Sequence, residues 1–115
     1  MHNISQDPMY FIYRDMIGLE AWIKHKFNTK PQEFIPIGKV IDETYNLIIT
    51  SKMENPAHYH QDEKKYVKKN YIFRFKVPKY ANGHIIMEVD GEKLLKRPEN
   101  RIKQIRKIRY VKTNE

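Results

Sequence analysis

Apolar and polar residues alternate with a period of two over most of this chain, from about Leu19 to Leu95. The alternation is clearest in residues 71–77, where one face carries Tyr71, Phe73, Phe75 and Val77 and the other carries Ile72, Arg74 and Lys76. This period is typical of β-strands that bury one face. It favours core positions over base stacking for Phe73 and Phe75, and leaves both readings open for Tyr71. In residues 19–24 the same period separates Leu19, Ala21 and Ile23 from Glu20, Trp22 and Lys24.

Further short strands are predicted at residues 35–42, 47–50, 64–69, 85–89 and 93–95. Turn chemistry separates them: residues 42–46 join a hairpin, and Asn82-Gly83 and Asp90-Gly91 are tight-turn signals. Residues 51–63 are polar, contain Pro56 and predict a loop. The predicted fold is mainly β, with about six strands. A small twisted antiparallel barrel is favoured over an open sheet, because closure removes unpaired strand edges.

The two ends of the chain show helical rather than alternating patterns. Asp7-Pro8 suits a helix start, and Gly18 suits its end. Near the C-terminus, Ile102, Ile105 and Ile108 recur every three residues after a start at Arg97-Pro98-Glu99. We therefore predict a single domain with an N-terminal helical arm (1–17), a β-barrel (18–96) and a basic C-terminal helix and tail (97–115).

Length and composition narrow the class of protein. A chain of 115 residues with 40% hydrophobic residues fits one globular domain. The absence of Cys excludes disulfides and thiolate metal sites. No apolar run approaches the roughly 18 residues that cross a bilayer, and residues 1–7 show no secretory pattern. The expectation is a soluble, cytoplasmic protein that makes no membrane contact.

The positive charge of the chain is concentrated near the C-terminus. Lys93–Lys112, here called the basic segment, holds nine Lys or Arg and one acid. Its net charge is therefore +8, the same as the net charge of the whole chain. A basic stretch joined to a small β domain indicates a polyanionic partner, most readily a folded RNA, although a solvated tail remains the alternative. The predicted RNA-binding residues are Lys96, Arg97, Arg101, Lys103, Arg106 and Lys107, with Lys68, Lys69, Arg74 and Lys76 extending the surface.

Two other readings of polar residues stay open at this point. Lys64, Lys65, Lys68 and Lys69 lie on a predicted edge, where lysines often serve only to block aggregation. His58, His60 and Asp62 resemble a metal site, and Asp42, Glu43, Glu88 and Asp90 resemble nuclease carboxylates, but their loop or turn context favours structural roles. No catalytic or metal-binding residue is therefore predicted.

Three blocks of the sequence resemble the archaeal ribonuclease P protein component 1 family. They are residues 17–21 (Ile-Gly-Leu-Glu-Ala), residues 37–50 from Ile-Gly-Lys-Val to Ile-Ile-Thr, and a third block. The third block joins Phe73-Arg-Phe75 to Met87-Glu-Val-Asp-Gly91, Leu94-Leu95 and Arg97-Pro-Glu-Asn-Arg-Ile102. The blocks occur in family order over about residues 15–103. Departures are confined to Val67-Lys68-Lys69 and to longer segments at 51–63 and 79–84.

The resemblance implies an Sm-like barrel and a non-catalytic RNA-binding subunit of ribonuclease P, which removes the 5′ leader of precursor tRNA. The RNA of that assembly performs the cleavage with Mg²⁺, so no cofactor is expected on this chain. Implied partners are the ribonuclease P RNA, a small zinc-binding protein subunit in a heterodimer, other ribonuclease P proteins and, indirectly, precursor tRNA. The N-terminal helix is rich in aromatic and Met side chains, which favours a protein interface over a helix that only caps the barrel, and the resemblance points the same way. The predicted interface comprises Met9, Tyr10, Ile12, Tyr13, Met16 and Val40. A generic Sm-like RNA chaperone or ribosome-associated barrel and a stand-alone metal nuclease are the alternatives.

Overall fold

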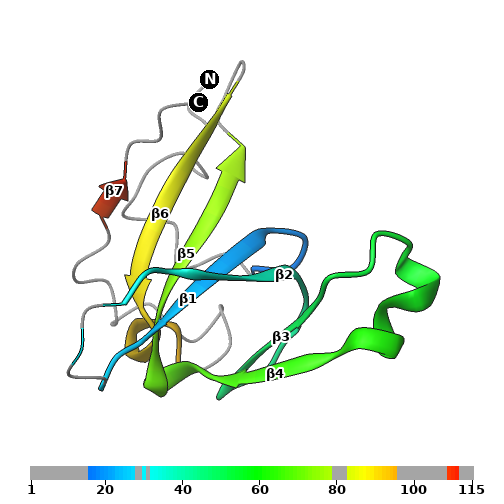
Figure 1. The fold of residues 1–115 in the computed structure, drawn as a ribbon, viewed down its shortest axis with the longest axis horizontal. Coiled ribbons are helices and arrows are strands. Elements are labelled where there is room, and N and C mark those ends of the chain that lie inside the picture. The colour runs from blue at the N-terminus through cyan, green and yellow to red at the C-terminus, as the bar shows by residue number, and fades with distance from the viewer. Residues whose placement is uncertain (1–15, 28–29, 31, 79–82, 96–108, 112–115) are drawn as a thin grey trace.

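In the part of the chain that the structure describes, seven antiparallel strands form one strongly twisted sheet (Figure 1). The structure is a computed structural model and describes residues 16–27, 30, 32–78, 83–95 and 109–111. The strands are β1 (Glu20–His25), β2 (Ile35–Glu43), β3 (Leu47–Ser51), β4 (Lys64–Val67), β5 (Tyr71–Pro78), β6 (His84–Asp90) and β7 (Arg109–Val111). Their order across the sheet is β4-β3-β2-β1-β5-β6-β7. The described pairings leave β4 and β7 at the two edges, so the sheet is barrel-like but open.

The mainly β, twisted antiparallel fold expected from the sequence is confirmed. The alternation in residues 71–77 corresponds to β5, whose Phe73, Phe75 and Val77 are buried while Arg74 and Lys76 are half-buried on the opposite face. In β1, Ala21 and Ile23 are buried and Glu20 is exposed. The period of two therefore identified both strands and the face that each one buries.

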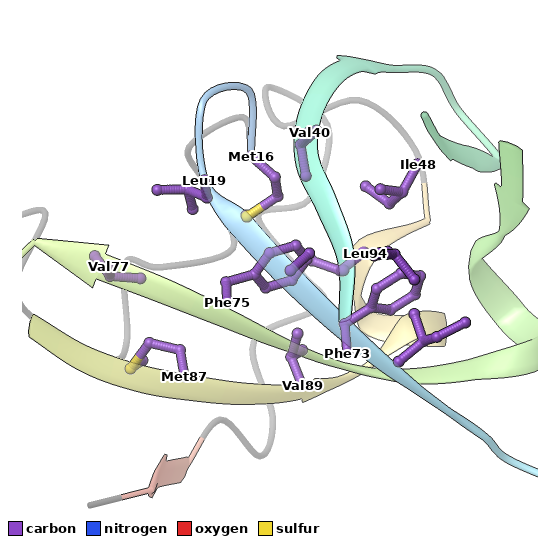
Figure 2. Close-up of a cluster of buried hydrophobic side chains, with 13 residues drawn as sticks. Met16, Leu19, Val40, Ile48, Phe73, Phe75, Val77, Met87, Val89 and Leu94 are labelled. Carbon is purple, nitrogen blue, oxygen red and sulfur yellow. The ribbon is translucent and has the colours of Figure 1, made fainter. Parts of the chain in front are cut away.

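One hydrophobic core fills the concave side of the sheet (Figure 2). It draws on β1, β2, β3, β5 and β6, on the residues just before β1 and on the end of the segment Gly91–Leu94. Its members are Met16, Leu19, Ala21, Ile23, Ile37, Val40, Ile48, Phe73, Phe75, Val77, Met87, Val89 and Leu94. The rings of Phe73 and Phe75 stack with centroids 5.7 Å apart. The aromatic pair therefore lies inside the fold, as its spacing predicts.

Three short 3₁₀ helices among the described residues correct the sequence-based elements. η3 (Pro56–Asp62) lies in the predicted loop, because Asn55 accepts a hydrogen bond from the Ala57 N–H and Pro56 suits the first turn. η4 (Lys68–Asn70) ends the predicted strand 64–69 at Val67. Figure 1 shows the connection between β3 and β4, with η3 in it, extending away from β5 and β6.

The last predicted strand, at residues 93–95, is wrong. Residues Gly91–Leu94 form the 3₁₀ helix η5, because the Asp90 carboxylate accepts the Glu92 N–H and turns the chain at its first residue. The strand β7 was not predicted, and it lies within the segment expected to be helix and tail. Most of the predicted N-terminal helix, Asn82 of the predicted turn and residues 97–108 of the predicted C-terminal helix and tail lie outside the described residues.

Candidate nucleic-acid interface

Residues on the outer face of the sheet, the face opposite the core, form a row that crosses five strands. Pro36 of β2 pairs with Trp22 of β1, Trp22 with Arg74 of β5, Arg74 with Glu88 of β6, and Glu88 with Arg109 of β7. Directly paired residues on antiparallel strands share a face of the sheet. The register therefore brings an aromatic residue and two arginine positions into line, which we call the outer row.

Arg74 is held in place within the outer row. Its Nε donates to Glu88 Oε1 over 2.9 Å, and its guanidinium lies 4.0 Å from the ring centroid of Phe34. The ammonium of Lys24 lies 5.2 Å from the same ring. An aromatic face attracts cations, so Phe34 gathers two positive side chains on this surface. The ion pair with Glu88 offsets one of them and fixes the direction of the other donors of Arg74.

A second line of paired residues runs beside the outer row. Lys39 of β2 pairs with Glu20 of β1, and Glu20 pairs with Lys76 of β5. Lys39 is exposed and Lys76 is half-buried. Together with Lys24 and Arg74, these side chains give the outer face four cations on three strands.

The sequence predicts that Lys68 binds RNA on the surface of the domain. The structure shows that its side chain is buried, so the predicted surface position is wrong. Its side chain is 0% exposed, and its Nζ donates to Glu43 Oε2 at 2.8 Å. The same Nζ donates to the backbone oxygens of Thr44 at 2.7 Å, Tyr45 at 3.3 Å and Leu94 at 2.7 Å. A buried ammonium needs such partners, because leaving water is costly for a charge. Lys68 is therefore a structural link between the β2–β3 turn, η4 and η5.

The other lysines near β4 are on the surface. Lys64, Lys65 and Lys69 are exposed, and the first two lie on β4, which pairs with β3 on one side only among the described residues. Their position fits either of the two readings left open by the sequence, a guarded sheet edge or an extended RNA surface.

The helix η5 fixes the point at which the basic segment begins. Leu94 is 0% exposed, and Gly91 packs so closely on the Lys68 carbonyl that a side chain there would overlap it. Lys26, at the end of β1, bridges Asp90 at 2.9 Å and Glu92 at 3.1 Å. Burial alone would lower the pKa of Lys26, but the hydrogen bonds and charges of Asp90 and Glu92 raise it overall. The start of the basic segment is therefore tied to the barrel.

Two residues of the predicted protein interface are core residues. Met16 is 0% and Val40 is 1% exposed, and both belong to the hydrophobic cluster, so assigning them to a surface is wrong for the described structure. The remaining interface residues, Met9, Tyr10, Ile12 and Tyr13, lie outside the described residues. So do the predicted RNA-binding residues Lys96, Arg97, Arg101, Lys103, Arg106 and Lys107.

The polar residues considered for metal binding have structural contacts. Glu43 Oε1 accepts the Met16 N–H at 3.1 Å, and Glu88 pairs with Arg74. In η3, the exposed His60 ring lies 3.1 Å from Glu63 Oε1. Within the described ranges no group of three or more His, Cys, Asp or Glu could hold a metal ion. No helix in that part of the chain is long and apolar enough to cross a membrane.

The outer face also holds residues that sequence reasoning did not single out as functional. Trp22, Lys24, Phe34 and Lys39 are brought together only by the pairing of β1 with β2 and β5. The alternation in residues 19–24 already set Trp22 and Lys24 on the side away from the core, which was the available signal. Which strands would lie beside them was not readable from the period alone.

Fold and surface define a small basic β domain whose outer face combines cations with aromatic rings. Comparison with known sequences assigns this domain to a family. A sequence model described as "Ribonuclease P/MRP, subunit p29" matches residues 10–104, and the chain belongs to this family. The resemblance inferred from the three sequence blocks is thereby confirmed.

Relatives named "Ribonuclease P protein component 1" match most of the chain. The protein of Methanosarcina mazei is 35% identical over 107 residues, covering 89% of this chain and 90% of that protein. The protein of Methanosarcina barkeri is 36% identical over 107 residues, which again cover 89% of this chain and 90% of that protein. That of Methanococcoides burtonii is 35% identical over 103 residues, which cover 89% of this chain and 94% of that protein.

Proposed function

We propose that this chain is a non-catalytic, RNA-binding subunit of ribonuclease P that stabilises the catalytic RNA for removal of the 5′ leader of precursor tRNA. Family membership supports its place in a ribonuclease P assembly. The proposal assigns the chemistry to the RNA and its Mg²⁺, and gives this chain the task of neutralising phosphates in a cytoplasmic complex.

The observation that carries the proposal is that the two described parts of the basic segment, residues 93–95 and 109–111, both lie against the barrel. The segment holds the whole excess charge of the chain. Its first residues belong to η5, which Lys68 and Lys26 tie to the barrel, and residues 109–111 form β7 on the edge of β6. Positive charge attached at both ends to a rigid domain is suited to holding an RNA fold in one arrangement, because phosphate contacts fix position and orientation.

We further propose a heterodimer with the small zinc-binding subunit of ribonuclease P. The resemblance supports this partner, and an apolar side chain lies next to the predicted interface: Ile17 is 47% exposed, directly after the buried Met16. The Gly18 N–H donates to the Val40 carbonyl at 2.8 Å, which ties the turn that carries Ile17 to β2. Exposed apolar side chains of this kind are common in protein interfaces.

Reconstitution tests the function. Adding the purified chain and its zinc-binding partner to ribonuclease P RNA should lower the Mg²⁺ concentration needed to cleave precursor tRNA, because the protein cations replace part of the metal's charge screening. An unchanged Mg²⁺ requirement at all ratios would contradict the proposal. The chain alone, without RNA, should not cleave precursor tRNA, and cleavage that stops on chelation would favour a metal nuclease instead.

Arg97 and Arg101 provide a sharper test of phosphate contact. Changing both to Ala should weaken binding of ribonuclease P RNA and flatten the plot of log affinity against log salt by about 2, one unit for each lost phosphate contact. The matched control changes both to Lys, which keeps the charge but not the planar fork, so the slope should stay while affinity falls modestly. An unchanged slope in the Ala variant would remove both residues from the contact surface.

A further inference from the structure

A groove of about 630 Å³ lies beside Trp22, the only tryptophan in the chain. β1 and β2 form one side of it, and the segment that follows β3 forms the other. The lining residues that matter for its chemistry are Trp22, Pro36, Lys39, Lys52, Met53 and Glu54. The part of the predicted loop next to β3 thus has a defined place, as one wall of a groove on the sheet.

Local irregularities in two strands open this groove. The pairing of β1 with β2 shifts register between Ala21 and Trp22, and such bulges change the direction in which a side chain points. Opposite this shift, Gly38 has φ +95°, and a Cβ there would lie 2.5 Å from the Ser51 carbonyl oxygen. Glycine is therefore needed where β2 comes closest to the end of β3.

The far wall is held by side chains of its own loop. The Lys52 N–H donates to Asp62 Oδ2 at 2.9 Å, which ties the wall to the end of η3. The Met53 N–H donates to Ser51 Oγ at 3.1 Å. These contacts tie the Lys52 and Met53 side of the groove to η3 and to the end of β3.

The chemistry of the groove is divided between an apolar surface and charged groups. Trp22, Pro36 and Met53 supply apolar contact, and Lys39 and Lys52 are exposed cations. The structure records no ion pair for these two lysines within its described residues, in contrast to Lys26 and Lys68. A volume of about 630 Å³ is in the usual range for small-ligand sites, roughly 300–1,000 Å³.

We propose that this groove binds one unpaired nucleotide of the partner RNA, with its base stacked on Trp22 and its flanking phosphates at Lys39 and Lys52. The inference rests on the proposed function and specifies where single-stranded RNA is held. A groove lined by a flat aromatic ring and by cations matches a nucleotide, which joins a planar base to anionic phosphates. The carboxylate of Glu54 accepts hydrogen bonds from exocyclic amino groups of the base.

The position of Trp22 supports an RNA occupant over a free small molecule. Trp22 of β1 pairs with Arg74 of β5 in the outer row. Glu20, which also lines the groove, pairs with Lys76 of β5. A nucleotide in the groove therefore adjoins further cations on β5. An extended, multiply charged chain uses this continuity, whereas a single small anion does not.

Fluorescence of Trp22 gives a direct test with the full chain. Titration with hexa-adenylate should quench the emission in a saturable way, because a stacked base quenches indole. An abasic hexamer with the same number of phosphates should bind weakly and leave the emission unchanged. Lys39→Ala with Lys52→Ala should weaken the hexa-adenylate interaction about 10-fold while the full quench is still reached. Equal quenching by both oligomers, or none by either, would overturn the stacking proposal.

Affinity for ribonuclease P RNA gives a second readout. Trp22→Leu should lower affinity about 10-fold, since base–aromatic stacking carries effects of that order, whereas Trp22→Phe should stay within about threefold. Circular dichroism checks that both variants melt like the wild type. Should Trp22→Leu fail to fold, the Lys39 and Lys52 variant, which keeps Trp22, decides the question by its quench titration.

The two proposals fail separately. If the wild-type chain does not bind ribonuclease P RNA but shows base-dependent quenching with hexa-adenylate, the groove inference survives and the proposed function is overturned. If the wild type binds ribonuclease P RNA and Trp22→Leu binds it equally well, the groove inference is overturned and the proposed function stands.

Discussion

Replacing Lys68 by methionine removes an ammonium that joins four oxygens from three parts of the fold. Its Nζ donates to the Glu43 carboxylate at 2.8 Å and to the carbonyls of Thr44, Tyr45 and Leu94 at 2.7, 3.3 and 2.7 Å. Methionine has a similar length but no donor. In the variant the Glu43 carboxylate, whose side chain is 1% exposed, keeps its hydrogen bond from the Met16 N–H but loses the Lys68 ammonium.

The expected loss is large for a domain of this size. Breaking a buried ion pair by removing one partner costs about 3–5 kcal/mol, because a charge stays buried without compensation. The unfolding free energy of a typical domain is only about 5–15 kcal/mol. At about 4 °C for each kcal/mol, Lys68→Met should lower Tm by roughly 12–20 °C.

Guanidinium unfolding followed by Trp22 fluorescence and circular dichroism measures the effect. The matched control is Lys69→Met, an exposed lysine one residue further on, which should change the unfolding free energy by no more than about 0.5 kcal/mol. The double variant Lys68→Met, Glu43→Leu removes both charges and should lose at least about 2 kcal/mol less than the sum of its two single changes. Equal stability of the Lys68 and Lys69 variants would refute the structural role of Lys68.

Two further predictions concern the same region. Gly91→Ala should destabilise the fold by about 3 kcal/mol in guanidinium unfolding, because its Cβ would overlap the Lys68 carbonyl. The control Gly83→Ala, at φ +79° with nothing within 4 Å of the added Cβ, should cost only about 1 kcal/mol. Equal losses in the two variants would contradict the packing argument. The pKa values of Lys26 and Tyr66 are both raised on folding, that of Tyr66 mainly by burial and then by Tyr71 and Asp62. Their stabilising contributions are therefore complete below about pH 10 and lost as pH rises further, so the unfolding free energy measured across pH 7–9 should show no effect of either group and should fall above pH 10.

Most strands could be predicted from the sequence, because the alternation of apolar and polar residues lies within each strand. The alternation in residues 71–77 placed Phe73 and Phe75 in the core, where both are 0% exposed. The sequence predicts a strand at residues 93–95 where the 3₁₀ helix Gly91–Leu94 ends, because the apolar Leu94 fits either element and the deciding contact is the Asp90 cap. Local patterns thus predicted the strand faces better than the irregular turns.

The site was less predictable because its contacts join distant parts of the chain. Lys68 looks like one more surface lysine in a basic run, and only the fold brings Glu43 and the Leu94 carbonyl to it. Trp22 and Arg74 become neighbours only when β1 pairs with β5. Side-chain type alone predicted a basic, RNA-directed surface, whereas the identity of its members depends on strand order.

The pairing of β7 with β6 has an entropic consequence for the charged residues that precede it. The chain is fixed on the domain at η5, where Leu94 is buried, and again at β7, where Arg109 pairs with Glu88. Bringing two such points together across about 13 intervening residues has a closure cost of about 2 kcal/mol. That ordering cost is met during folding, so docking of a polynucleotide gives up less chain freedom than it would with a tail fixed at one end only.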